Sequence, residues 1–378
     1  MLLGLVSLLN DISSEIIQPI LPLFIISLGG GPEAVGLIGG ISDGVPSILK
    51  IFSGYWSDRL GRRKPLIVGG YGLSAIAKIA LAFSATWQQV FVLKAAERSG
   101  KGIRDVPRDA MISESTEKNA MGRGFGLHRA MDSSGAVLGS ALAYILWKEG
   151  FDFRLIFLVA GIMAIAALLP FYRVQESFRS GLNESPDLSL SNLSPDLRRF
   201  IAIASIFALG NFSYMFFILR TQQFFTGALA IGAPLLLYIL FNVVYALFSY
   251  PVGILSDRIG RKRVLVSGYA IFALTAAGFI VASSTIGLVI LFCLYGLVYA
   301  LTDGSEKAFV SDLSNESIRC TSLGIYYGAV GFASIFSGII AGALWSTFSP
   351  GITFAFGSVA ALLAAFALWR SKEAKETF

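Results

Sequence analysis

The sequence predicts an all-α integral membrane protein with twelve transmembrane helices in two pseudo-symmetric six-helix bundles. Hydrophobic residues make up 55% of the 378 residues and charged residues only 14%, whereas about a quarter of the residues of soluble domains are charged. The apolar runs are about 20 residues long, which suits helices that cross a hydrocarbon core about 30 Å thick. A charged motif occurs twice, at Gly54–Lys64 and at Gly253–Arg263, which indicates an internal duplication.

The apolar runs place the spans in chain order. The spans are predicted to begin near Leu2, Val35, Leu66, Gln89, Met121, Leu155, Phe200, Ala233, Val264, Ile286, Cys320 and Gly351. Ten-residue segments of alternating hydrophobicity are missing from the sequence, which argues against the other spanning architecture, a closed barrel.

Basic residues indicate the orientation of the chain. Lys and Arg cluster after spans two, six, eight and twelve, whereas the opposite loops carry little beyond Lys148 and Arg154. By the positive-inside rule we expect a multi-pass protein of the cell membrane with both termini in the cytoplasm. Topology explains the net charge of +6, so nucleic acid is not an expected partner. The expected partners are the lipid bilayer, a small-molecule substrate and protons, and we expect a monomer.

A polar segment divides the twelve spans into two sets of six. Residues 175–199 are rich in Ser, Asn, Pro and Asp and are predicted to form a cytoplasmic linker between bundles at 1–174 and 200–378. Ala110–Trp147 aligns without a gap with Ala308–Trp345. A repeat in the same orientation places a pseudo-twofold axis along the membrane normal, an arrangement used by alternating-access transporters.

Charged side chains inside the first bundle are the main candidate site residues. Asp11 and Glu15 are four residues apart in span one and therefore share one helical face. A carboxylate at the bilayer centre costs roughly 2.5 to 3.5 kcal/mol, so this face predicts a water-filled cavity or bound partners. The alternative is that either acid only pairs with a base on a neighbouring span.

Spans two to five add further charges with more than one interpretation. In span four, Arg98 near the middle is the preferred functional base, and Arg104 and Asp105 near one end are expected in a gate network. In span five, Asp132 lies four residues from His128, so a local pair is the first expectation and proton transfer the alternative. Asp43 and Lys50 of span two are expected to neutralise neighbouring helices, and Lys78 of span three to snorkel. 

The second bundle carries fewer charges within its spans. Asp303 and Lys307 are four residues apart and can neutralise each other, which leaves Glu306 as the unmatched charge of span ten. Polar and aromatic residues that face the midline would form a deformable binding wall; the candidates for this cavity are Asn211, Tyr214, Arg220, Asn242, Tyr245 and Tyr326.

On these features the chain resembles the major facilitator superfamily of secondary transporters over essentially its whole length. The family's loop signature, Gly-x-x-x-Asp-Arg-x-Gly-Arg-Arg, is matched by Gly54, Asp58, Arg59, Gly61, Arg62 and Arg63, and its second copy carries Gly253, Asp257 and Arg258. Within the superfamily the chain is most similar to twelve-helix, proton-coupled drug exporters, because Arg98-Ser-Gly-Lys-Gly102 approximates their span-four signature. Their span-five signature ends in Pro, whereas Ser140 follows Gly139 here.

The resemblance implies a gating role for the repeated loop. With the cytoplasmic side closed, Gly54 would let span two approach span eleven, and Asp58 would face the N-terminal end of span eleven near Arg319. Asp257 would face the start of span five near Gly122 by pseudo-symmetry. Such contacts would set the equilibrium between two conformations.

The predicted function is proton-driven export of lipophilic or cationic compounds. Asp11, Glu15, Arg98, Asp132 and Glu306 are the candidates for proton coupling or substrate contact. A symporter or uniporter for a small polar or anionic metabolite is the alternative, favoured by the bases Arg98, Lys101 and Arg220, and a membrane sensor that does not transport is a third hypothesis. Enzymatic activity, a metal site and a cofactor are not expected, because no metal-ligand cluster, nucleotide loop or nucleophile constellation occurs in the sequence.

Overall fold

The protein was described from a computed structural model, which covers residues 2–60, 62–114, 121–173, 193–314 and 318–371. Helices make up the spans: α1 (Leu2–Ile17), α2 (Leu21–Ser27), α3 (Pro32–Leu60), α4 (Lys64–Ala82), α5 (Trp87–Glu114), α6 (Met121–Lys148), α7 (Phe153–Ala166), α8 (Pro195–Gly210), α9 (Tyr214–Gln222), α10 (Leu229–Ile259), α11 (Arg261–Val281), α12 (Thr285–Asp312), α13 (Arg319–Thr347) and α14 (Pro350–Arg370), with a short 3₁₀ helix, η2 (Leu169–Arg173), after α7. The predicted all-helical fold of twelve spans is confirmed, with α1 and α2 forming the first span and α8 and α9 the seventh.

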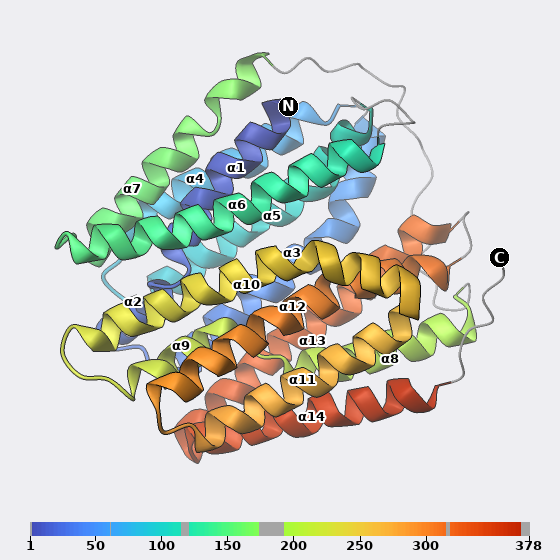
Figure 1. The fold of residues 1–378 in the computed structure, drawn as a ribbon. Coiled ribbons are helices and arrows are strands. Elements are labelled where there is room, and N and C mark those ends of the chain that lie inside the picture. The colour runs from blue at the N-terminus through green and yellow to red at the C-terminus, as the bar shows by residue number, and fades with distance from the viewer. Residues whose placement is uncertain (1, 61, 115–120, 174–192, 315–317, 372–378) are drawn as a thin grey trace.

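Two groups of helices lie side by side, as Figure 1 shows. The first contains α1 to α7 and the second α8 to α14, and the start of α1 lies at the same end of the molecule as the end of α14. We call this end the terminal face and the other end the opposite face. Most residues of the predicted linker lie outside the described ranges, and α8 already begins at Pro195.

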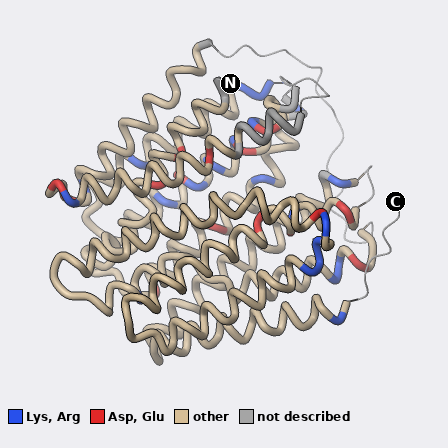
Figure 2. The backbone as a smooth tube through the Cα atoms, in the orientation of Figure 1, with Lys and Arg blue, Asp and Glu red and all other residues tan. Residues whose placement is uncertain are grey.

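Ten spans among the described residues are long and apolar enough to cross a membrane. The remaining two are α5 and α6, whose charges lower their hydropathy. Figure 2 shows acidic and basic residues deep within the first group of helices, whereas those of the second group gather toward the terminal face. Helices with interior charges cannot face lipid, so their charges must be satisfied within the protein.

Local sequence explains where the helices begin and break. Side-chain oxygens cap several N-termini; the Asp152 carboxylate, for example, accepts a hydrogen bond from the Leu155 amide at 2.8 Å. The first span breaks at Gln18-Pro19-Ile20, because proline provides no amide hydrogen for the helical ladder. The seventh span breaks at Asn211-Phe212-Ser213, and Gly357 of α14 packs against this break. The two breaks occupy corresponding positions in the two bundles.

The two bundles meet most closely through glycines of α3 and α13. A Cβ atom added at Gly36 would lie 2.2 Å from the carbonyl oxygen of Gly338, and one at Gly44 would lie 2.4 Å from that of Gly331. Both contacts therefore require glycine. Between α6 and α10 the closest approach is near the opposite face, where the Trp147 ring would lie 2.8 Å from a Cβ at Gly232. The bundles are thus in tight contact on the side of the opposite face.

Candidate functional site

Glu15 links the two bundles at the level of the broken helices. The Tyr238 hydroxyl of α10 donates a hydrogen bond to Glu15 Oε2 at 2.9 Å, and Gln18 Nε2 donates to Glu15 Oε1 at 2.9 Å. The break after α1 also exposes the Gln18 carbonyl, which accepts a hydrogen bond from the Tyr214 hydroxyl at 3.1 Å. Two tyrosines of the second bundle therefore bind the interrupted first span of the first bundle.

Arg98 extends this network into the first bundle. Its Nη2 donates to Gln18 Oε1 at 3.3 Å, and its Nε lies 3.3 Å from Glu97 Oε2. Glu97 also pairs with Lys94 at 2.9 Å, with side-chain exposures of 1% and 2%. The network thus runs from Lys94 through Glu97, Arg98 and Gln18 to Glu15, so the predicted candidates Glu15 and Arg98 lie in one network.

Lys78 does not snorkel, contrary to the sequence-based expectation. Its side chain is only 1% exposed, and its Nζ lies 2.8 Å from the Ser14 hydroxyl and 3.0 Å from the Ser13 hydroxyl. Asn10 Oδ1 is a third acceptor, at 3.5 Å. The ammonium group is therefore held inside the first bundle, where three polar residues of α1 replace its water.

Asp11 and Asp132 lie together in a second cluster near the terminal face. Their carboxyl groups lie close enough to interact electrostatically, and His128 Nδ1 lies 3.2 Å from Asp132 Oδ2. The Ser7 hydroxyl donates to Asp132 Oδ1 at 2.8 Å and accepts from Arg108 Nη1 at 3.3 Å. Two neighbouring carboxylates repel each other, and the contacts of Asp132 with His128 and Ser7 offset part of this repulsion. The expected pairing of His128 with Asp132 is present.

The charged side chains near the terminal end of α5 have separate partners. Asp105 pairs with Lys50 of α3 at 3.3 Å, whereas Arg104 is 1% exposed and donates to the Ser74 hydroxyl at 2.8 Å. The Arg104 guanidinium also stacks over the Tyr71 ring at 4.2 Å. Arg104 thus fastens α5 to α4 inside the first bundle.

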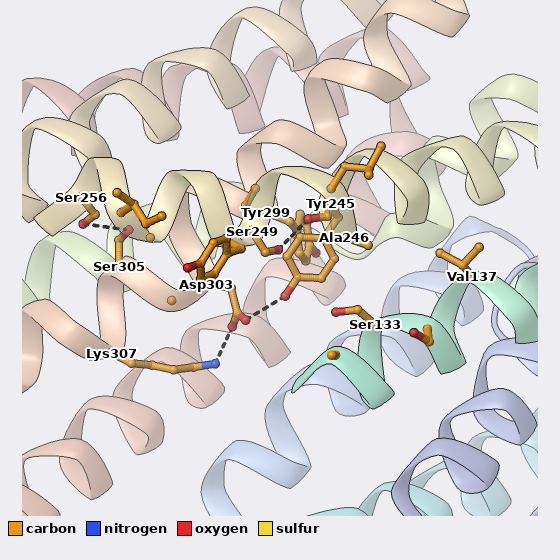
Figure 3. A pocket seen from close by; sticks show the side chains of 18 of the residues that line it. Ser133, Val137, Tyr245, Ala246, Ser249, Ser256, Tyr299, Asp303, Ser305 and Lys307 are labelled. Carbon is orange, nitrogen blue, oxygen red and sulfur yellow. Dashed lines mark hydrogen bonds and ion pairs between the residues drawn. The ribbon is translucent and has the colours of Figure 1, made fainter. Parts of the chain in front are cut away.

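A cavity of about 1260 Å³ separates the bundles on the side of the terminal face. It lies between α6 on one wall and α10 and α12 on the other, and Figure 3 shows Ser133 and Val137 opposite Tyr245, Tyr299 and Asp303. The Tyr245 hydroxyl donates to Asp303 Oδ2 at 2.9 Å, and Lys307 binds Asp303 Oδ1 at 2.6 Å. The predicted Asp303–Lys307 pair is present. A cavity of this size can hold a drug-sized molecule.

The other cavity candidates divide into three groups. Tyr214 and Asn242 lie near Glu15 and Tyr238, while Asn211 belongs to the helix break. Tyr326 and Tyr269 both donate hydrogen bonds to Glu306, which places Glu306 within the second bundle. Arg220 lies away from the cavity, because its Nε donates to the Phe279 carbonyl at 3.3 Å and its Nη1 to Gln223 at 3.0 Å.

Gly54 and Asp257 have neighbours other than the gating contacts expected for the repeated loop, and the contact expected for Asp58 lies outside the described part. Gly54 faces α5, where an added Cβ would lie 3.2 Å from Val106, and nothing lies within 4 Å at Gly253. Asp257 pairs at 3.0 Å with Arg261 of its own bundle. Among the remaining motif residues, Arg59, Arg62 and Arg258 are exposed and Arg63 is partly buried, while Gly61 and the side chain of Asp58 lie outside the described part.

Sequence reasoning missed several residues of the network. Tyr238 and Gln18 were not among the candidates, although the Gln18-Pro19 pair interrupts an otherwise apolar span and could have marked the break. Asp43 was expected to neutralise a neighbouring helix, yet its carboxylate has no hydrogen-bond or ion-pair partner among the described residues and is exposed. A single acid in an apolar span gives no indication of what it faces.

Known proteins share this architecture. The model of the Major Facilitator Superfamily matches residues 3–238 and residues 200–377. An uncharacterized MFS-type transporter of Methanocaldococcus jannaschii is 46% identical over 97% of this chain and 93% of its own length. A multidrug resistance protein MdtH of Aeromonas hydrophila is 26% identical over 85% of this chain and 81% of its own.

Solved structures agree on the fold. A variant of the nucleoside transporter NupG superposes with a TM-score of 0.82 at 15% identity, covering 97% of this chain and 98% of its own. A D-xylose–proton symporter gives a TM-score of 0.77 at 16% identity, covering 98% and 96%. Their substrates differ, so these likenesses describe the fold alone. Taken with the family match and the archaeal relative, the twelve-span duplicated architecture shows that this chain belongs to the major facilitator superfamily of membrane transporters.

Proposed function

We propose that the protein is a proton-coupled exporter that works by alternating access, with lipophilic or cationic compounds as substrates. The observation that carries the proposal is the hydrogen bond from Tyr238 to Glu15, since it joins a titratable acid of one bundle to the other bundle. A hydrogen bond to a charged acceptor is stronger than one to a neutral group. Protonation of Glu15 would therefore weaken a contact between the bundles, which couples proton binding to their relative movement.

The two ends of the molecule support an alternating mechanism. The bundles are in close glycine contact toward the opposite face and separated by the cavity toward the terminal face. We propose that both termini are cytoplasmic and that the protein resides in the cell membrane as a monomer. On this orientation the conformation described is inward-facing, and export requires the glycine contacts of α3 and α13 to open.

The cavity and one relative support the proposed substrate class. The walls on α10 and α12 carry the tyrosines Tyr245 and Tyr299, an aromatic surface suited to apolar and cationic molecules. The similarity to a multidrug resistance protein is in keeping with this substrate class. The acids Glu15 and Asp11 lie in two separate clusters, and Glu15 is the acid whose hydrogen bond joins the two bundles.

Transport into proteoliposomes tests the proposal. With an imposed pH gradient, wild-type protein should move a fluorescent lipophilic cation against its concentration gradient, and a protonophore should abolish this movement. Glu15→Gln should lose gradient-driven transport while retaining substrate exchange, because glutamine keeps the hydrogen-bonding shape without the titration. Exposed Asp196→Asn, which removes an acid at the start of α8, is the matched control. Normal coupling in Glu15→Gln and in Asp11→Asn would refute the assignment of the coupling acid.

A second function is favoured by the bases of α5. Arg98 and Lys101 both act electrostatically on the region around Glu15, so a symporter or uniporter of a small polar or anionic metabolite is the alternative. Uptake of anions that increases with an inward proton gradient would favour it over export of cations. Absence of flux for every class of solute would instead favour the hypothesis of a membrane sensor.

A further inference from the structure

Asp43 occupies a defined face of α3. Gly36, Gly40 and Gly44 pack on α13, whereas Gly102 of α5 packs on Pro46 and Leu49. Asp43 lies on the stripe between these two faces, because helical residues four and seven apart share a face. Its neighbours on that stripe are Gly39, which faces Ser213 at the break before α9, and Lys50.

Among the described residues, the Asp43 carboxylate has no hydrogen-bond or ion-pair partner, whereas most acids of this region do. Glu97, Asp105 and Asp303 form ion pairs, and Glu15 and Glu306 accept hydrogen bonds from tyrosine hydroxyls. The Asp43 side chain is exposed, and among the described residues no donor lies within bonding distance of it. Water or a ligand must therefore satisfy this carboxylate, because an unpaired charge within a membrane span is costly.

A wall of aromatic rings in the second bundle lies within electrostatic range of Asp43. Tyr295 and Tyr299 of α12 are close enough to interact electrostatically with the Asp43 carboxylate, as is Tyr214 of α9. The wall is continuous, since the rings of Tyr295 and Tyr299 are 5.2 Å apart and both lie next to Phe241, at 5.0 Å and 5.2 Å. Tyr299 also lines the cavity between the bundles.

The surrounding bases leave Asp43 available. Arg98 and Lys94 bind Glu97, and Lys50 binds Asp105. Arg98, Lys101 and Lys94 all act electrostatically on Asp43, Arg98 most strongly, but Lys101 also acts on Asp11 and Asp105. Among the described residues, each of these bases therefore also serves another acid.

We propose that Asp43 is the counter-charge for an organic monocation, an ammonium or phosphonium compound whose apolar groups pack on Tyr299, which is backed by the buried rings of Tyr295 and Phe241. This inference rests on the proposed function and names the substrate site within it. A carboxylate on one bundle and an aromatic wall on the other fit such a cation, because aromatic faces attract positive charge and an apolar body needs an apolar surface. The cation would bring the bundles together, since its charge contacts α3 and its body contacts α12.

Binding of tetraphenylphosphonium to the purified wild-type protein in detergent tests the inference, measured by isothermal titration calorimetry with protein-free micelles as the blank. Asp43→Asn should weaken binding at least about tenfold, the loss expected for one charge contact in a partly desolvated site. Glu33→Gln removes an exposed acid from the same helix and should bind like the wild type. Asp43→Glu should recover part of the affinity, and Lys101→Met should bind the cation more tightly because a competing base is lost.

The possible results distinguish a failure of the proposed cation site from a failure of the proposed transport function. Equal affinity in the wild type and Asp43→Asn, or no cation binding by the wild type, would overturn the site. Tetraphenylborate, an anion of similar shape, should bind more weakly than the cation, and tighter binding of the anion would also overturn it. Binding that depends on Asp43, together with proteoliposomes that show no proton-driven flux, would support the site and refute the proposed function.

Discussion

Replacing Gly338 with alanine should shift the protein away from the conformation described. A Cβ at this position would lie 2.2 Å from the Gly36 carbonyl oxygen and 2.8 Å from the Gly40 Cα atom. Ordinary contact begins near 3.4 Å, so α3 and α13 would have to separate by about 1.2 Å, the difference of the two distances. Overpacking of this kind costs about 1 to 3 kcal/mol, which corresponds to a shift in the conformational equilibrium of about 5-fold to about 150-fold.

Pulsed electron paramagnetic resonance can measure this shift. Spin labels at Tyr172→Cys and Trp369→Cys report the separation of the two bundles at the terminal face, where both side chains are exposed; Cys293 and Cys320 would be replaced by serine. Opening of the α3–α13 contact should be accompanied by closure of the terminal face, so Gly338→Ala should populate shorter distances. Gly72→Ala is the control, because nothing lies within 4 Å of that position. An unchanged distance distribution in Gly338→Ala would refute the view that these glycines hold one of two states.

Three further substitutions test the surrounding network. Tyr238→Phe removes the hydroxyl that binds Glu15 and should reduce proton-coupled transport while leaving thermal stability nearly unchanged; coupling equal to the wild type would show that this bond is not part of the mechanism. Lys78→Met leaves Ser14 and Asn10 without their ammonium partner and should lower stability by about 1 to 3 kcal/mol, measured as a lower apparent Tm in detergent, and an unchanged Tm would contradict the buried contact. Arg220→Gln should transport at the wild-type rate, because Arg220 binds the Phe279 carbonyl away from the cavity; a large loss of transport would restore it as a site residue.

The sequence was sufficient to predict the fold because its signals are strong and local. Long apolar runs, a repeated loop and an ungapped repeat all indicate the same twelve-span duplication, and the structure confirms it. The pairs four residues apart, Asp303 with Lys307 and His128 with Asp132, were predictable for the same reason, since helical spacing alone brings them together.

Contacts between helices far apart in sequence could not be predicted in this way. In the sequence, Lys78 is a single charge in an apolar span, so its side chain is expected to extend toward water. Its partners instead lie in α1, 64 to 68 residues away. The bond between Tyr238 and Glu15 spans 223 residues and depends on how the two bundles dock. The gating motif illustrates a different limit, because its contacts are predicted for a conformation with the terminal face closed, and the structure describes a conformation with a cavity at that face.

The two bundles differ in how many charged residues lie in their interiors. The first bundle holds most of the interior acids and bases, and nearly all of them satisfy one another, as Lys94, Glu97 and Arg98 do. Two acids of the first bundle act on the second bundle: Glu15 accepts a hydrogen bond from Tyr238, and Asp43 lies within electrostatic range of Tyr295. If a proton binds to Glu15 and a cation binds to Asp43, both ligands act on the contact between the two bundles. The competition required for antiport then arises from the relative position of the bundles and does not require the proton and the cation to share one carboxylate.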